Sequence, residues 1–261
     1  MSRTPLNLAS LPELPVPRLD VVEATGSTNA DLLARHASGE DIRGTVLLAE
    51  HQSAGRGRNG RSWSAPPRSQ IALSIGVDTD GVPAQAWGWL PLLTGVALVD
   101  AVRASTGIEA GVKWPNDVLV GSGKLAGILA EVAAPDPIIV VGLGVNVTLT
   151  AEEAPDPRAT SLQMLGATML DREVLIAAIL RELTTRIQKW RTAGGPDRAL
   201  VEDYRNRSIT LGSRVRAVMP GDREITGIAI DIDTLGRLII DTSAEVATVS
   251  AGDITHLRPA D

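Results

Sequence analysis

Hydrophobic and polar positions alternate along residues 19–205 in a way that predicts strands and helices in mixed order. Short apolar runs bounded by Gly, Pro, Asn or Asp are typical of strands, whereas apolar residues repeated every three or four positions are typical of amphipathic helices. Residues 171–191 show the helical pattern most clearly, and Asp171 is placed to cap that helix. We expect strands at residues 19–23, 45–50, 70–77, 112–114, 118–120, 125–132 and 138–147, and helices starting at Ser27 or Thr28 and spanning 87–104, 171–191 and 196–204.

From residue 208 the pattern changes to short apolar runs at close, regular spacing, separated by turns rich in Gly and Asp. This is typical of a small β-barrel of the SH3 kind. The predicted strands cover residues 208–211, 215–219, 224–232, 238–241, 246–250 and 254–257. We therefore divide the chain into an extended, partly disordered arm over residues 1–18, a mixed-sheet α/β domain over 19–205 and an SH3-like domain over 206–261.

Composition narrows the classes of protein that fit. Hydrophobic residues make up 44% of the 261 positions, which is enough for a large core, and the absence of Phe means that this core is mainly aliphatic. The absence of Cys excludes disulfides and thiolate metal sites and suits a reducing compartment, so we expect a cytoplasmic protein. No apolar run is long enough for a membrane span. No helix-turn-helix module fits ahead of residue 20, so we expect no DNA operator as a partner.

Residues 55–61, Gly-Arg-Gly-Arg-Asn-Gly-Arg, cannot form part of a core. The stretch follows the apolar run at 45–50, so we expect a loop that leaves the end of a strand. Arg56, Arg58 and Arg61 supply charge, and the glycines let the backbone approach a ligand closely. Since the whole chain has a net charge of −6, any anion binding depends on such local arginine density. The loop therefore predicts a polyanion site, with a solvated surface loop as the alternative.

The same loop also spells G-x-G-x-x-G, the fingerprint of dinucleotide-binding folds, and Asp78 lies where that fingerprint wants an acid. That fold needs a helix to open directly on the loop. Pro66 and Pro67 follow instead, and they oppose a helix at this place. We do not expect a dinucleotide site of this type.

Three further polar stretches interrupt the predicted strands. They are Lys113-Trp-Pro-Asn-Asp117, Ser122-Gly-Lys124 and Gly142-Leu-Gly-Val-Asn146. Each has a structural alternative: a turn with an internal salt bridge, an ordinary hairpin lysine and an amide that satisfies nearby backbone groups. Together with the arginine loop they predict a pocket that neutralises phosphate and carboxylate. No nucleophile–base pair or metal-binding His spacing accompanies them, so we expect transfer through an activated phosphate, promoted by positioning and charge neutralisation.

These motifs, in this order, resemble those of the biotin–protein ligases. The resemblance rests on GRGRNGR at 55–61, KWPND at 113–117, SGKLAGIL at 122–129 and GLGVNV at 142–147, with Ser27-Thr28-Asn29 and the run 49–52 ahead of them. It covers residues 20–258. It implies a catalytic domain akin to class II synthetases, followed by an SH3-like domain. It also implies two steps: biotin and ATP form biotinyl-5′-AMP and pyrophosphate, and a carrier lysine then takes the biotinyl group. Mg²⁺ is implied as the counterion of ATP.

The resemblance also implies roles for individual residues, with Lys124 and Arg58 as the catalytic pair. The implied biotin site comprises Ser27, Thr28, Asn29, Gln52, Arg56, Gly57, Arg58 and Lys124. The implied ATP and adenylate site comprises Arg56, Arg58, Arg61, Trp63, Lys113, Asn116, Asp117, Asn146 and Arg258. No residue is assigned as a metal ligand.

The implied partner is the biotin carboxyl carrier domain of acyl-CoA carboxylases, with no DNA and no membrane, and the expected oligomeric state is a monomer or a weak dimer. A lipoate–protein ligase of the same fold group is the first alternative. A nucleic-acid-binding protein that uses the Arg/Gly loop and the β-barrel is the second. The acidic net charge and the few aromatic residues disfavour the second alternative.

Overall fold

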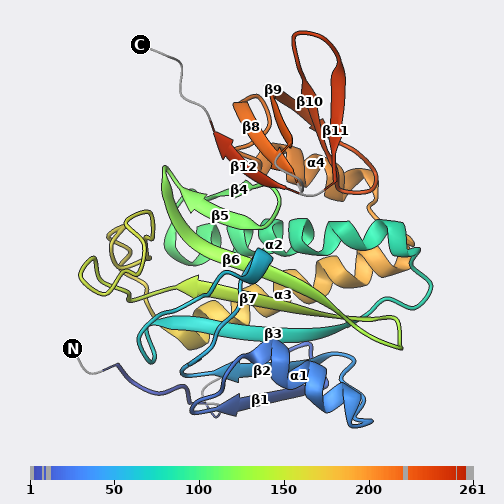
Figure 1. The fold of residues 1–261 in the computed structure, drawn as a ribbon. Helices are drawn as coiled ribbons and strands as arrows, with labels where there is room; N and C mark the ends of the chain where they lie inside the picture. The colour runs from blue at the N-terminus through green and yellow to red at the C-terminus, as the bar shows by residue number, and fades with distance from the viewer. Residues whose placement is uncertain (1–2, 8, 10–12, 220–222, 251, 257–261) are drawn as a thin grey trace.

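The computed structural model describes residues 3–7, 9, 13–219, 223–250 and 252–256. Its elements form two sheets with helices packed on the larger one (Figure 1). The first sheet contains β1 (Arg18–Val22), β2 (Thr45–Ala49), β3 (Gln70–Asp78), β4 (Gly111–Lys113), β5 (Asp117–Val120), β6 (Gly123–Ala133) and β7 (Ile138–Asn146). The second contains β8 (Arg214–Met219), β9 (Arg223–Ile232), β10 (Leu238–Asp241), β11 (Val246–Val249) and β12 (Asp253–His256). The α-helices are α1 (Thr28–Ala37), α2 (Trp89–Thr106), α3 (Arg172–Thr192) and α4 (Arg198–Arg207), and short 3₁₀ helices cover Arg58–Gly60 and Ala84–Gly88.

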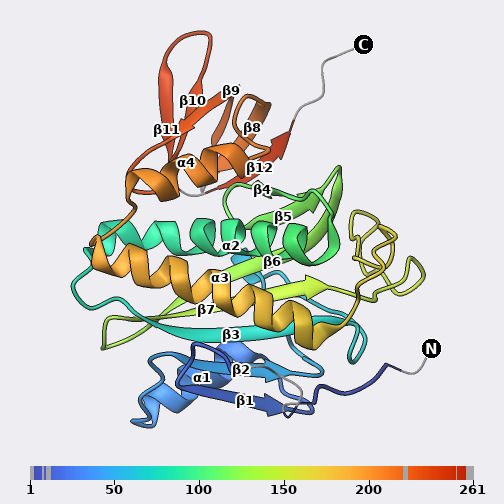
Figure 2. The same cartoon turned by 180° about the vertical axis from the view of Figure 1, so that it is seen from behind.

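The larger sheet has the order β1-β2-β3-β7-β6-β5-β4 and is mixed, because β1 runs parallel to β2 while the other neighbouring pairs are antiparallel. Helices α2 and α3 lie side by side over its back face (Figure 2). Alternate residues of each strand point to this face, which explains why Ile71, Leu73, Val141 and Leu143 join the main core. The mixed α/β class predicted from the sequence is confirmed.

The front face of the same sheet carries different residues. Helix α1 covers part of it and packs Leu32 against Leu47 and Val140. Further along the strands the front-facing positions are small or polar. Ser74 of β3 is paired with Gly142 of β7, and Gly144 lies two residues further along β7. An apolar core cannot form over such residues, so this end of the front face is free to hold a site.

The second sheet, of order β11-β10-β9-β8-β12, is antiparallel, as the sequence pattern after residue 208 predicts. The turn between β9 and β10 docks it on the first sheet. The Trp89 indole donates to the carbonyl of Thr234, and the Trp114 indole donates to that of Gly236, both at 3.0 Å. Both tryptophan side chains are buried, and they join the second sheet to α2 and to the turn between β4 and β5.

Two details of the prediction need correction. Residues 208–211 form no strand beyond a single bridge at Ser208, because the Ser208 hydroxyl accepts the backbone N–H groups of Thr210 and Leu211. The long helix predicted from residue 87 begins at Trp89, after the 3₁₀ turn.

The predicted N-terminal arm is docked where the structure describes it. Arg3 forms an ion pair with Glu153 at 2.6 Å and donates to the Thr148 carbonyl at 2.8 Å, so residues 3–7 are not loose. The remainder of this prediction at residues 1–2, 8 and 10–12 lies outside the described part of the chain.

Asp78, the acid of the apparent dinucleotide fingerprint, pairs with Arg191 of α3 and lies 3.6 Å from Arg43. No α-helix opens on residues 55–61, which contain only the Arg58–Gly60 3₁₀ turn. The structure therefore excludes the dinucleotide reading, as the two prolines indicated.

Three helices are joined by a cluster of ion pairs around Asp100 of α2. Its carboxylate lies 2.5 Å from both Arg186 of α3 and Arg207 of α4, and Asp203 of α4 contacts both arginines. This cluster holds α4, and with it the start of the second sheet, against the back of the first.

We expect Asp100→Asn to lower the free energy of unfolding by about 1–2 kcal/mol, because two charge-assisted hydrogen bonds on partly buried arginines are weakened. Urea denaturation measures this. The matched control is Glu109→Gln, which breaks an exposed pair with Arg103 and should change stability by less than about 0.5 kcal/mol. Equal effects of the two changes would contradict a structural role for the cluster.

Candidate active site

A cavity of about 580 Å³ lies on the front face of the larger sheet. It is bounded by the start of α1, the Arg/Gly loop, the strands β6 and β7, the segment 155–159 and the first residues of β12. Every predicted site residue that the structure describes lines it: Ser27, Thr28, Asn29, Gln52, Arg56, Gly57, Arg58, Arg61, Trp63, Lys113, Asn116, Asp117, Lys124 and Asn146. Arg258 lies outside the described residues. The structure thus brings together motifs that are more than a hundred residues apart.

One end of the cavity is polar and uncharged. Ser27 caps α1, and Gln52 accepts hydrogen bonds from the backbone N–H and the hydroxyl of Thr28 at 2.9 and 3.1 Å. The hydroxyl of Ser74, on the adjacent β3, lies 2.6 Å from both Thr28 Oγ1 and Asn29 Oδ1, and its single proton can be donated to either oxygen. These side chains are buried and fix one another, so this end presents amide and hydroxyl groups in set positions.

The floor of the cavity is built on glycines. A Cβ atom at Gly142 would clash with the side chain of Asn29, and one at Gly144 would clash with the indole of Trp63. The indole is further held by a 2.6 Å hydrogen bond from Nε1 to Gln70 Oε1. A glycine within a strand lets another group approach the backbone closely, and at these two positions the groups are the side chains of Asn29 and Trp63.

The other end of the cavity is cationic. Lys124 lies on β6 itself, with its Nζ 2.7 Å from Asp117 Oδ1 and 5.6 Å from the ring centroid of Trp63. The internal salt bridge considered for residues 113–117 therefore does not form within that turn, because Asp117 pairs with Lys124. Burial lowers the pKa of Lys113, with Asp117 partly opposing this shift. A cation that has lost solvent in this way favours an anionic ligand.

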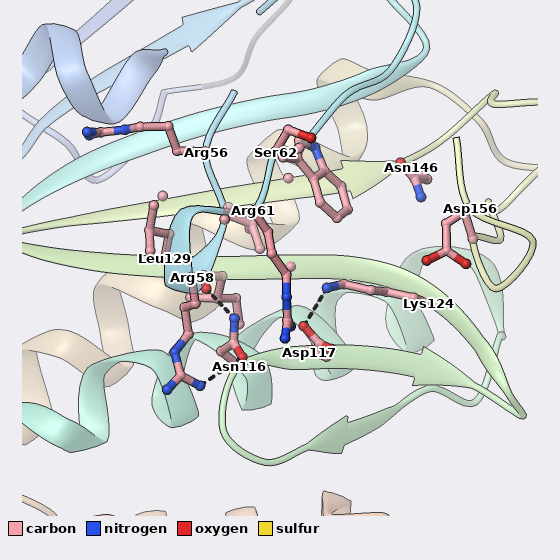
Figure 3. Close-up of a pocket in the computed structure, with 18 of the residues that line it drawn as sticks. Arg56, Arg58, Arg61, Ser62, Asn116, Asp117, Lys124, Leu129, Asn146 and Asp156 are labelled. Atoms are coloured by element: carbon pink, nitrogen blue, oxygen red, sulfur yellow. Dashed lines mark hydrogen bonds and ion pairs between the residues drawn. The ribbon is translucent and has the colours of Figure 1, made fainter. Parts of the chain in front are cut away.

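The three loop arginines have different partners, and Figure 3 shows that Arg56 and Arg58 point in different directions. Arg58 donates to Asn116 Oδ1 at 3.4 Å, and burial lowers the pKa of its guanidinium. Arg61 pairs with Asp253 of the second sheet. Arg56 points away from Lys124 in Figure 3 and pairs with Glu131. The loop is therefore tied to both sheets and does not project freely into solvent.

The sequence left open whether Asn146 belongs to the pocket or satisfies a nearby backbone group, and it does both. It lines the cavity, and its amide nitrogen donates to the Thr160 carbonyl at 2.9 Å, so it also satisfies a backbone group.

Several residues of the site escaped the sequence analysis. Glu131 and Ser74 bond to Asn29 but are not among the residues that line the cavity. Both are polar interruptions of apolar strands, and that signal could have identified them. Asp253 and the pair Asp156–Arg158 reach the cavity from segments with no motif. The Arg158 side chain, by its hydrogen bonds, lowers the pKa of Asp156 to about 2, so this acid is ionised at neutral pH.

The composition of the lining limits the chemistry. No histidine is among the residues that line the cavity. The described part of the chain also contains no group of three or more His, Asp or Glu side chains that could hold a metal ion, and none of its helices is long and apolar enough to cross a bilayer. A cavity with a neutral polar end and a cationic end suits a ligand with a polar uncharged head and a phosphate-bearing tail.

Comparison with known proteins agrees with this geometry. The family model described as the biotin/lipoate A/B protein ligase family matches residues 21–146, and that of the biotin protein ligase C terminal domain matches residues 210–257. The chain is 56% identical to the biotin–[acetyl-CoA-carboxylase] ligase of Mycobacterium tuberculosis over 92% of this chain and 90% of that protein. The chain belongs to the biotin protein ligase family.

Two further members of the biotin protein ligase family have lower identity to this chain. The bifunctional ligase/repressor BirA of Escherichia coli is 33% identical over 92% of this chain and 74% of that protein. The solved biotin protein ligase of Aquifex aeolicus in complex with biotin and ATP superposes with a TM-score of 0.78 at 25% identity, over 93% of this chain and 99% of that one. The fold match covers both sheets of the present chain.

We expect Gly144→Ala to destabilise the protein by about 1–3 kcal/mol, because the added methyl group overlaps the Trp63 indole. Urea denaturation measures the loss. The control is Gly26→Ala, whose methyl group meets no atom within 4 Å. In the double variant Gly144→Ala with Trp63→Leu, the loss of stability should be smaller than the sum of the losses in the two single variants, because the smaller leucine side chain makes room for the methyl group. Strict additivity would show that the clash lies elsewhere.

Proposed function

We propose that the protein is an ATP-dependent biotin–protein ligase that acts on a lysine of a biotin carboxyl carrier domain. The observation that carries the proposal is that one cavity joins the uncharged amide and hydroxyl end at Thr28 and Gln52 to the cationic end at Lys124 and Lys113. Biotin has an uncharged ureido ring and a carboxylate, and ATP supplies the polyanion. Family membership supports the same reaction.

In the first step, a carboxylate oxygen of biotin attacks the α-phosphorus of ATP. The bond from that phosphorus to the bridging oxygen of the β-phosphate breaks, and pyrophosphate leaves. Both reactants are anions, so the barrier depends on cations that screen them at the point of attack. Lys124 is proposed for this role, because its ammonium lies at the inner, cationic end of the cavity beside Trp63. Asp117 then serves to hold this ammonium in position.

In the second step, the neutral ε-amine of the carrier lysine attacks the carbonyl carbon of the mixed anhydride. The bond from that carbon to the phosphate oxygen breaks, AMP leaves, and the amine proton passes to solvent or phosphate. No covalent enzyme intermediate is needed, which suits a cavity without a nucleophile–base pair. The protein contributes position, charge and exclusion of water.

The remaining roles follow from position in the cavity. Ser27, Thr28, Asn29 and Gln52 form the biotin end, and Arg56 and Gly57 belong to the loop that crosses it. Arg58 is proposed to close over the adenylate from its contact with Asn116. The proposed nucleotide end comprises Arg61, Trp63, Lys113, Asn116, Asp117, Asn146 and, from the chain beyond the described residues, Arg258.

The acidic side chains at this end do not fit a resident magnesium site. Asp117 pairs with Lys124, and Asp253 pairs with Arg61. The hard oxygen ligands that Mg²⁺ prefers would come mainly from phosphate and water. We propose that the ion enters as the counterion of ATP.

The deciding experiment is biotin-dependent exchange of labelled pyrophosphate into ATP, with lipoate as the parallel substrate and no carrier present. We expect exchange with biotin alone. Exchange with lipoate alone would support the adenylation chemistry but would show that the substrate is that of a lipoate–protein ligase. Exchange with neither substrate, in a folded sample, would refute the proposed function.

We expect Lys124→Ala to reduce the exchange rate by about a hundredfold or more, because the charge that develops at the α-phosphate loses its closest ammonium. The fold should persist, since this side chain is about one-third exposed and not part of the core. The control is Lys189→Ala, an exposed lysine of α3 that lies outside this cavity. Unchanged exchange in Lys124→Ala would remove this residue from the mechanism.

We expect Arg58→Gly to release the adenylate about tenfold faster, because a charge-assisted contact over the phosphate is lost. The measurement is biotin incorporation into a bystander protein that has exposed lysines and no carrier domain. Arg58→Lys retains the positive charge and should release less adenylate than Arg58→Gly. Parental retention of the adenylate in Arg58→Gly would contradict a closing role for this loop residue.

A further inference from the structure

Glu131 of β6 has no role in the proposed mechanism, yet it joins two parts of the site. Its Oε2 atom accepts a hydrogen bond from Asn29 Nδ2 at 2.9 Å and one from Arg56 Nη2 at 2.8 Å. These partners lie 102 and 75 residues away along the chain. One carboxylate oxygen is therefore the meeting point of α1, β6 and the Arg/Gly loop.

Both N–H groups of the Asn29 amide are used within the protein. Its nitrogen also donates to the Leu129 carbonyl at 3.1 Å, while its oxygen lies 2.6 Å from the Ser74 hydroxyl. Gly142 leaves the space in which the amide lies. Because an amide has two donors and one acceptor atom, Glu131 and Leu129 decide which way the group faces. A ligand can then meet only the oxygen side of Asn29.

Arg56 differs from the other two loop arginines. Arg58 and Arg61 contact residues at the nucleotide end, whereas Arg56 points away from Lys124 and Asp117 (Figure 3). Its guanidinium is paired with Glu131, so its charge adds little to the field that acts on phosphate. Its place at the start of the loop suits an anchor that fixes the loop on β6.

We propose that Glu131 is a positioning residue that ties the Arg/Gly loop, through Arg56, to the Asn29 amide at the biotin end of the cavity. The inference rests on the proposed function. Loss of the Glu131 charge weakens two contacts at once, because the same carboxylate oxygen accepts from Arg56 of the loop and from the amide of Asn29. We expect the effect on biotin binding and on retention of the adenylate, because Asn29 lies at the biotin end of the cavity and Arg56 points away from Lys124 (Figure 3).

The test uses Glu131→Gln, Arg56→Gln and the double variant in the full chain. Each single change should raise the KM for biotin and the release of biotinyl-5′-AMP by about tenfold, the usual size of a lost charge-assisted hydrogen bond. In Glu131→Gln, the KM for ATP and the exchange rate at saturating substrates should stay within about twofold. The double variant should be no worse than either single variant, because both changes break the same contact. Arg56→Lys, which keeps a cation for Glu131, should raise the KM for biotin less than Arg56→Gln does.

The control is Glu109→Gln, which removes a carboxylate from an exposed pair outside the residues that line the cavity. Parental biotin KM and parental adenylate release in Glu131→Gln would overturn the proposal. Additive effects in the double variant would also overturn it. A uniform loss in every kinetic constant together with a lower urea midpoint would do the same, because that result indicates general destabilisation. Absence of biotin-dependent exchange in the parental protein would instead refute the proposed function, and this inference would fall with it.

Discussion

Gly142 and Gly144 keep the front of β7 free of side chains, and the cavity depends on that free space. The Asn29 amide lies against the first glycine and the Trp63 indole against the second. Either contact would be lost if a methyl group occupied the same place. Further contacts depend on these two, because the ammonium of Lys124 lies over the ring of Trp63 and the amide oxygen of Asn29 lies within hydrogen-bond distance of Ser74. Backbone exposure in the middle of a sheet usually weakens it, and here it makes room for the site.

The positive charge of the cavity is local, and carboxylates offset only part of it. The chain as a whole is acidic, with a formal charge of −6, so long-range attraction of nucleotides is weak. Inside the cavity, Arg58 and Lys113 are desolvated enough that burial lowers the pKa of each. Carboxylates such as Asp117 hold the cations in place without neutralising all of them. An arriving phosphate therefore finds cations that are already oriented and that gain from a counter-charge, which is the arrangement that preorganised electrostatic catalysis needs.

The second sheet is part of the site as well as a separate unit. The indoles of Trp89 and Trp114 bond to backbone carbonyls in its β9–β10 turn, and this contact fixes where β12 lies. Strand β12 then brings Asp253 to Arg61 of the loop. A wall of the cavity is thus supplied by residues that have no local motif, and it is in place only when both sheets are folded and docked.

Local pattern and composition determined much of this protein. Apolar periodicity predicted the strands and helices of the mixed sheet, because burial on one face leaves a repeat of two or of about three and a half residues. Charged and glycine-rich interruptions of these runs identified Arg58, Lys124 and Asp117, since such residues have no place in a core. Only the tertiary structure decided the partners: Asp117 with Lys124 and not with Lys113, and Glu131 with Arg56. The choice of partner depends on strand order, strand register and the docking of distant segments. The spacing of residues along the sequence does not specify how close such segments lie in the fold.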